Sequence, residues 1–234
     1  MSTQQPHGHI VKGVDEEQQR LKGELLRMGA MAADQLVAAL AVVDRRDDAA
    51  ARRIMEADAE IDRLEQETSQ DVMKLALRGP LARDLREILA AIRIAADLER
   101  IGDYAANVAK RSVALNAAPP LPQIRGLAAL GELAAAQVRR VMDAYRDGDA
   151  DAARRVRDAD AAVDAQYTGL FRELLTYMME DPRHITGCTH LLFMAKNIER
   201  IGDHATNIAE NVLFLVTGDE SFPPREKRDT TSGA

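Results

Sequence analysis

One 15-residue segment occurs twice in this chain, and it constrains the fold more than any other feature of the sequence. Residues 96–110 (ADLERIGDYAANVAK) align without gaps with residues 196–210 (KNIERIGDHATNIAE), and both copies contain Glu-Arg-Ile-Gly-Asp. Matching hydrophobic residues flank both copies, so the match is too long to be a coincidence. The chain is therefore predicted to contain two copies of one supersecondary unit.

Each copy of the repeated segment has two faces when it is placed on a helix, where successive residues are about 100° apart. One face is an apolar stripe, which we predict to be the core seam of its unit. Its members are Ile94, Leu98, Ile101, Ala105, Val108 and Leu115 in the first copy, and Met194, Ile198, Ile201, Ala205, Ile208, Val212 and Leu215 in the second. Polar residues spaced by four lie roughly opposite: Glu99, Asp103 and Asn107, then Glu199, Asp203 and Asn207.

A glycine stands at the same place in both copies, at Gly102 and Gly202. Glycine inside a helix is less favourable than alanine by about 1 kcal/mol. We therefore expect another helix or a ligand to approach the backbone closely at these two positions.

Composition favours an all-α protein and excludes several partners. Hydrophobic residues make up 46% of the 234 residues, but aromatic residues only 3%, which suits helix-on-helix packing better than sheets. The formal net charge of −7 argues against nucleic acid or an anionic bilayer as a partner. The single cysteine, Cys188, excludes an internal disulfide, is consistent with a reducing compartment and is interpreted as a packing residue.

The sequence predicts a cytoplasmic protein with no direct membrane insertion. The N-terminus has neither the basic start nor the apolar region of a signal peptide. No apolar run is expected to approach the roughly 20 residues that a spanning helix needs. Any role at the membrane should then depend on a protein partner.

The first unit is predicted to be a three-helix bundle over residues 14–117. Residues 1–13, including His7 and His9, are interpreted as a disordered tail. One helix should end near residue 46, a second should be capped by Asp47 or Asp48 and stop at Gly79-Pro80, and a third should end before Asn116. A proline linker over residues 118–122 then marks the domain boundary.

The second unit is predicted to repeat this arrangement over residues 123–217. Residues 149–164 match residues 47–62 at an offset of 102, and the fifth helix should end near Asp181-Pro182. A sixth helix is expected over residues 184–217, followed by a disordered tail over 218–234. The predicted architecture is all-α, two tandem three-helix bundles related by an internal repeat.

Eight acidic residues form the candidate site of this sequence. Within each unit, two helices carry carboxylates spaced by four, which would lie about 6 Å apart on one helix face. The residues are Asp58, Asp62, Glu99 and Asp103 in the first unit, and Asp160, Asp164, Glu199 and Asp203 in the second. Four carboxylates at close range repel one another unless cations neutralise them, so divalent or trivalent metal ions are the expected ligands.

An ordinary alternative is that these acids are solvated and form ion pairs with arginines. The candidates for such pairs are Arg63, Arg93, Arg100, Arg157 and Arg200. The matching glycines and the recurrence of all four acids in the second unit stand against this alternative, and the spacing alone leaves both interpretations open.

The sequence contains no motif that would support catalysis. No histidine has a glutamate three positions before it, as di-iron carboxylate enzymes require, and no phosphate-binding GxxxxGK[ST] loop or cysteine-based metal motif occurs. His204 follows Asp203, but its counterpart in the first copy is Tyr104. The chain is therefore not expected to be an enzyme.

The repeated phrase resembles the hallmark of the PhoU family of phosphate-specific transport system accessory proteins. The resemblance rests on Glu-Arg-Ile-Gly-Asp at 99–103 and 199–203, on Asn107 and Asn207, and on residues 175–182 (LTYMMEDP), and it covers roughly residues 10–217. It implies two three-helix bundles and a homodimer, located in the cytoplasm or at the inner face of the membrane through partners.

The resemblance also implies a function and a cofactor. Family members are negative regulators of phosphate uptake and of the phosphate-starvation response, and link the phosphate ABC transporter ATPase to a sensor histidine kinase. Some members carry metal clusters at positions that correspond to the eight acids here. For this chain, Asn107 and Asn207 are candidate additional polar ligands. Iron, zinc, manganese and magnesium all stay open as the metal.

The hypothesis from sequence is an adaptor in which cation occupancy of the acidic sites sets the surface that is presented to partners. One rival is a metal-storage or metal-dependent hydrolytic helical bundle. The other is a purely structural helical scaffold with solvated acids.

Overall fold

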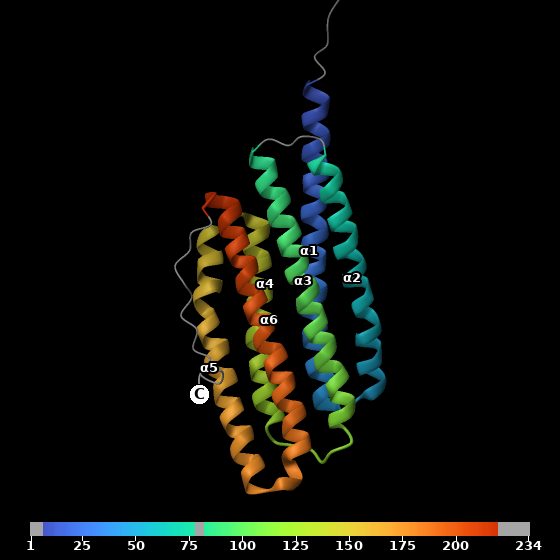
Figure 1. The fold of residues 1–234 in the computed structure, drawn as a ribbon, viewed down its shortest axis with the longest axis vertical. Helices are drawn as coiled ribbons and strands as arrows, with labels where there is room; N and C mark the ends of the chain where they lie inside the picture. The colour runs from blue at the N-terminus through green and yellow to red at the C-terminus, as the bar shows by residue number, and fades with distance from the viewer. Residues whose placement is uncertain (1–6, 78–81, 220–234) are drawn as a thin grey trace, which may run out of the picture.

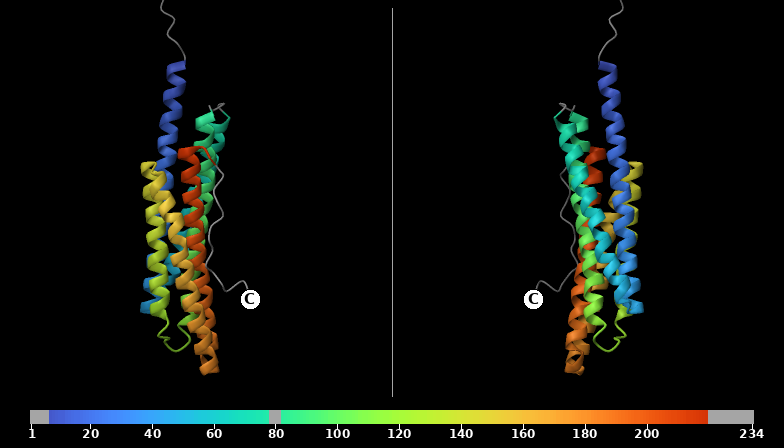
Figure 2. Two further views of the ribbon diagram at one scale, coloured as in Figure 1. Left: turned by 90° about the vertical axis from the view of Figure 1, so that its left-hand side faces the viewer. Right: turned by 90° about the vertical axis from the view of Figure 1, so that its right-hand side faces the viewer.

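The computed structural model describes residues 7–77 and 82–219, which form six α-helices and one short 3₁₀ helix. The elements are α1 (His7–Arg45), α2 (Asp48–Ala76), α3 (Ala82–Leu115), α4 (Ile124–Asp147), α5 (Ala150–Glu180), η1 (Pro182–His184) and α6 (Ile185–Thr217). The described residues contain no strand, and the helices run along one long axis (Figure 1, Figure 2). The predicted all-α architecture of two three-helix units is confirmed.

Local sequence signals determine the helix ends. The side chain of Asp47 accepts a hydrogen bond from Ala50 N at the start of α2, and Asp149 accepts one from Ala152 N at the start of α5, both at 2.9 Å. Gly218 ends α6 in the left-handed region at φ 76°. The predicted stop at Gly79-Pro80 lies outside the described residues.

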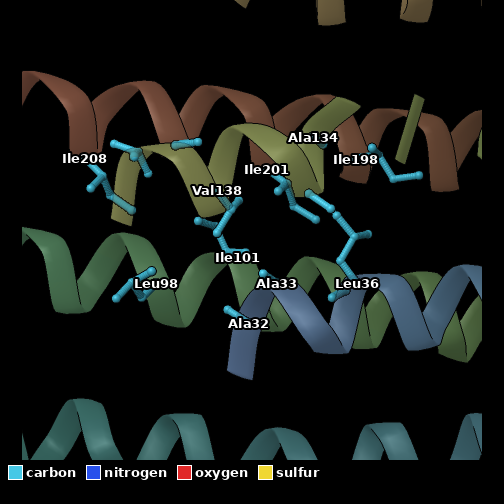
Figure 3. Packing of buried hydrophobic residues seen from close by; sticks show 14 of the residues in the cluster. Ala32, Ala33, Leu36, Leu98, Ile101, Ala134, Val138, Ile198, Ile201 and Ile208 are labelled. Carbon is cyan, nitrogen blue, oxygen red and sulfur yellow. The ribbon is translucent and has the colours of Figure 1, made fainter. Parts of the chain in front are cut away.

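The two three-helix units share one core. Helix α1 packs against α3 and α4, and α6 packs against the same two helices, so these four form the centre, with α2 and α5 outside them (Figure 1). Apolar side chains from both units gather there, among them Leu36, Ile101, Val138 and Ile201 (Figure 3). The repeats are therefore two halves of one continuous hydrophobic cluster.

The start of α1 corrects the predicted N-terminal tail. Helix α1 begins at His7, seven residues before the expected start, while residues 1–6 lie outside the described part. No proline follows Pro6 in this helix, and extending an existing helix adds one hydrogen bond per residue fixed. The N-terminal end of α1 extends beyond its neighbours (Figure 1).

Helix α1 also corrects the expectation about apolar runs. Its part Glu16–Arg45 is long and apolar enough to cross a membrane by length and composition, and 44% of the apolar window is buried in the protein. Leu25, Met28 and Leu36 of this helix are fully buried. Burial in the bundle accounts for the apolar composition, as in the core helix of a globular protein.

The segment between the two units is held by the turn between α1 and α2. Arg46 donates through Nη2 to the carbonyl oxygens of Asn116 and Ala118, at 2.5 and 2.8 Å. Arg46 has φ 55°, the conformation that Gly148 adopts at the equivalent turn of the second unit. The predicted linker at 118–122 lies within this non-helical segment between α3 and α4.

Candidate functional site

Three carboxylates of the first unit converge between α2 and α3. Asp58 and Asp62 extend from α2 and Asp103 from α3, and each offers an oxygen atom that lies within 4.8 Å of the other two. All three side chains are partly buried. The predicted meeting of acidic residues from two helices is therefore found in the first unit.

Glu99 and Glu65 extend this group, which we call the first acidic cluster: Asp58, Asp62, Glu65, Glu99 and Asp103. Burial is the largest cause of the raised pKa of Glu99. The charges of Asp103, Asp62 and Glu65 raise this pKa further, and the charge of Arg100 lowers it. Glu65 was not among the predicted ligands. Its position three residues after Asp62 on α2, on the same side of the helix, is the signal that could have found it.

Burial and mutual repulsion also raise the pKa values of the two α2 aspartates. For Asp58, burial has the largest effect, the hydrogen bond from Gln35 opposes it, and the charges of Asp62 and Asp103 add to it. For Asp62, burial is again the largest cause of the raised pKa, followed by the charges of Asp103 and Glu65. The cluster therefore disfavours its own ionised state when no counter-ion is present.

A glutamine supports the first acidic cluster from α1. Gln35 Nε2 donates to Asp58 Oδ1 at 2.8 Å and to the carbonyl oxygen of Gly102 at 3.1 Å. Sequence reasoning missed this residue. The signal was available, because Gln35 and Gln137 differ by the same offset of 102 as Asp58 and Asp160.

Gly102 has the close contact that its helical position suggested. A Cβ atom there would lie 2.9 Å from Asp58 Oδ1 and 3.0 Å from Ile61 Cδ1. Gly202 is similar, because its Cβ would lie 3.1 Å from Gln137 Oε1 and 3.2 Å from Val163 Cγ1. Both glycines allow α2 or α5 to approach the helix that carries the repeated phrase.

The second unit places the corresponding acids in a more buried setting. Asp160, Asp164 and Glu199 are 5%, 4% and 4% exposed, and Asp203 is partly buried. We call these four residues the second acidic cluster, although among the described residues the mutual approach within 4.8 Å is found only for the first unit. Lys196 Nζ lies 2.9 Å from Glu199 Oε1, so this cluster includes a cation from the chain itself.

The two asparagines do not join the clusters. Asn207 Nδ2 donates to Asp97 Oδ1 at 3.3 Å across the seam between α3 and α6. Asn107 is exposed. Among the described residues, neither amide contacts a carboxylate of the acidic clusters.

The arginine alternative accounts for only part of the first acidic cluster. Arg100 lies 3.4 Å from Glu99 Oε2 and 3.2 Å from Asp103 Oδ2, although its own side chain is 57% exposed. Arg63 pairs with Glu60 and Glu67, not with the neighbouring Asp62. Within the side chains that the structure describes, Asp58 and Asp62 have no cationic partner.

The donor set of the first acidic cluster fits a hard cation. Every converging side chain offers carboxylate oxygen, and this chemistry suits Mg²⁺, Mn²⁺ or iron better than ions that prefer nitrogen or sulfur. Three carboxylates converge here, and the pKa values of Asp58 and Asp62 are raised, so a multivalent cation would relieve their repulsion. The residues present therefore fit a metal ion.

These features define a class of protein: a helical bundle built from two three-helix repeats that share one core, with acidic residues at equivalent positions of both repeats and three converging carboxylates in the first. The family model described as the PhoU domain matches the chain twice, at residues 25–112 and 127–212. The chain belongs to the PhoU family.

Relatives and solved structures agree with this assignment. A Xylella fastidiosa protein named phosphate-specific transport system accessory protein PhoU homolog is 66% identical over 96% of this chain and 95% of its own length. A Rhizobium meliloti protein of the same name is 46% identical over 97% of this chain and 96% of its own length. The crystal structure of PhoU from Pseudomonas aeruginosa matches with a TM-score of 0.83 at 35% identity, covering 88% of this chain and 99% of that one.

Proposed function

We propose that this PhoU-family chain is a cytoplasmic adaptor that restrains phosphate uptake and the phosphate-starvation response. In this proposal it contacts the ATPase of a phosphate ABC transporter and a sensor histidine kinase, and acts as a homodimer. The names of its relatives, which call them accessory proteins of the phosphate-specific transport system, support the link to the transporter.

The first acidic cluster is the observation that carries the cation-dependent part of the proposal. Three carboxylates from α2 and α3 lie within 4.8 Å of one another, and burial and repulsion raise the pKa values of Asp58 and Asp62. Asp58, Asp62, Glu99 and Asp103 would hold a divalent or trivalent cation. A bound cation supplies positive charge that offsets the repulsion between the two helices.

The residues of the chain connect this cluster to the rest of the bundle. Gln35 links Asp58 of α2 and the backbone of α3 to α1, so a shift of Asp58 is transmitted to a helix of the shared core. Gly102 keeps α2 and α3 in close contact at the same level. Charge at the cluster therefore biases the packing of the outer helix α2 against α1 and α3, which changes the surface that a partner meets.

The test combines regulation with binding. A strain that lacks the gene is complemented with the wild-type chain, with joint Asp103→Asn and Asp203→Asn, and with Asp143→Asn as a control at an exposed aspartate of α4. Wild type and control should restore low alkaline phosphatase at high phosphate, and the joint variant should not. Normal repression by a folded joint variant, with unchanged metal content, would refute the cation-dependent adaptor.

A second readout separates the adaptor from a metal-dependent hydrolase. The purified chain, loaded with Mn²⁺, should pull down the transporter ATPase and should not turn over phosphate esters. Metal-dependent hydrolysis that is lost in the joint variant would favour the hydrolytic alternative.

A further inference from the structure

The second acidic cluster contains a lysine where the first has none. Lys196 Nζ lies 2.9 Å from Glu199 Oε1 and 5.1 Å from the centre of the Tyr167 ring. Glu199 is 4% exposed, whereas the Lys196 side chain is 35% exposed. The ammonium group is therefore held at the edge of the cluster by a buried carboxylate and by an aromatic face.

At the positions equivalent to Tyr167 and Lys196, the first unit carries more negative charge than the second. Tyr167 corresponds to Glu65 at the offset of 102, and Lys196 corresponds to Ala96 at the offset of 100. The negative charge of Glu65 acts on Asp62 and Glu99. These two positions contribute two formal charges to the difference between the clusters, and Arg100 offsets part of it, because Arg100 lies beside Glu99 and Asp103 whereas Arg200 lies over the Tyr104 ring.

A separate observation beside the second cluster is a buried amide group without a hydrogen-bond partner among the described residues. Gln137 is 3% exposed, and neither its amide oxygen nor its amide nitrogen has a hydrogen-bond partner among the described residues. Its Oε1 and Asp160 Oδ1 both lie beside Gly202, at 3.1 and 3.5 Å from the point where a Cβ would stand. In the first unit, the equivalent Gln35 is satisfied by Asp58 and Gly102. A buried amide oxygen beside carboxylates suits a hard cation.

We propose that Lys196 is a built-in counter-ion that competes with external cations for the second acidic cluster, so that the first cluster binds them more tightly. The proposal rests on the proposed function, because it concerns the cation sites named there. A cation that is coordinated by Glu199 must approach an ammonium group that already binds the same carboxylate, and like charges repel. In the first cluster the corresponding cation is Arg100, which lies farther from its carboxylates, at 3.2 and 3.4 Å, and is 57% exposed, and Glu65 adds attraction. The exchangeable cation would then sit between α2 and α3.

Calorimetric titration with Mn²⁺ on the chelator-stripped full chain tests this inference. Asp160→Asn with Asp164→Asn leaves only the first cluster intact, and Asp58→Asn with Asp62→Asn leaves only the second. The first-cluster background should bind Mn²⁺ at least about tenfold more tightly, the order expected for a like charge near a partly exposed site. In the background that keeps only the second cluster, Lys196→Ala should raise the Mn²⁺ affinity most of the way to that of the first-cluster background. Lys196→Arg should not raise it.

The reciprocal exchange provides the matched control. Ala96→Lys should weaken Mn²⁺ binding in the first-cluster background, whereas Lys196→Ala should leave that background unchanged. If a paired Asn background fails to fold by circular dichroism, the same two exchanges are made in the wild-type chain. There, Lys196→Ala should tighten the weaker binding phase and Ala96→Lys should weaken the tighter one.

Two results would overturn the inference in distinguishable ways. Unchanged or weaker binding after Lys196→Ala, with Mn²⁺ still bound by both clusters, removes the counter-ion role and leaves the proposed function standing. Absence of Mn²⁺ binding by the wild-type chain removes the cation sites altogether, and the pull-down of the transporter ATPase then decides whether an adaptor survives without them.

Discussion

The rings of Tyr104 and His204 lie against each other with their centres 5.6 Å apart, although they occupy equivalent positions in the two repeats. Residues related by an internal repeat meet in this way only near the axis that relates the two halves. The contact lies on the seam between α3 and α6, where His204 Nδ1 is 2.8 Å from Asp97 Oδ1. The seam between the repeats is therefore a specific polar and aromatic contact, in addition to shared apolar packing.

Replacing His204 with alanine should destabilise the protein at this seam. The substitution removes the partner of Asp97, whose side chain is 14% exposed, and leaves it with Asn207 at 3.3 Å. We expect a loss of about 1–2 kcal/mol in the free energy of unfolding, the usual effect of removing one partner from a largely buried polar pair. Urea denaturation measures it. Asn107→Ala, at an exposed position, is the control and should change little.

A glycine-to-alanine substitution should have opposite effects on stability at crowded and at open helical positions, and Gly102 is a crowded one. Gly102→Ala would place Cβ 2.9 Å from Asp58 Oδ1 and 3.0 Å from Ile61 Cδ1, so these two buried or partly buried side chains, or α2 itself, must shift. We expect destabilisation of about 1–3 kcal/mol, as for overpacking in general. Thermal unfolding and circular dichroism provide the measurement.

Gly23 and Gly169 are the matched controls for that substitution. Both lie inside helices, and a Cβ at either position would have no neighbour within 4 Å. Alanine there should stabilise the protein by about 0.5–1 kcal/mol, because it restricts the unfolded chain and favours the helix. A Gly102→Ala variant as stable as the Gly23→Ala variant would contradict the close approach of α2.

Most of the fold could be predicted from sequence because its signals are local. Helical periodicity, aspartates that cap α2 and α5, and prolines between the units were enough to place six helices. The internal repeat then predicted that the six helices form two equivalent units of three. The packing of both units around one core could not be obtained this way, because the stripes of α3 and α6 show that each helix has a buried face but not which helix covers it.

The acidic site was predicted in part. The spacing of four identified Asp58, Asp62 and Asp103, which do converge. The roles of Gln35 and Lys196 depend on which helices meet at that level, and helical spacing within one segment does not contain that information. Asn107 and Asn207 were placed with the acids by the same spacing, but the helix turns them toward solvent and toward the α3–α6 seam.

The two supporting glutamines should respond differently to an apolar replacement of similar size. Gln35→Met leaves Asp58 without its amide donor, so we expect destabilisation of about 1–3 kcal/mol. Gln137→Met removes an amide that has no partner among the described residues, so in the presence of chelator it should be neutral or stabilising. Urea denaturation of both variants in chelator makes the comparison. Equal losses would show that Gln137 is hydrogen-bonded like Gln35.

Neutralising one carboxylate of the first acidic cluster should stabilise the protein when cations are removed. Burial and the charges of Asp62 and Asp103 hold the pKa of Asp58 above the ordinary value of 3.8, so the folded state binds this proton more tightly than the unfolded state. The associated stability is present below the ordinary pKa and is lost as the pH rises through the folded pKa. At pH 7 in chelator, Asp58→Asn, which can still accept from Gln35, should gain about 0.5–1 kcal/mol after allowance for solvent screening.

The pH and cation dependence of this gain distinguish repulsion within the cluster from a general effect of charge. The advantage of Asp58→Asn should disappear below about pH 4, where both forms are neutral at this position. Added Mn²⁺ should reverse the order, because the wild-type cluster retains one more ligand and gains more from the cation. Glu56→Gln, at an exposed carboxylate of the same helix, should show neither effect. Thermal melts across about pH 3–8, with chelator or Mn²⁺, provide the measurement. A gain that persists at low pH or in Mn²⁺ would show that the carboxylates of the cluster do not repel one another.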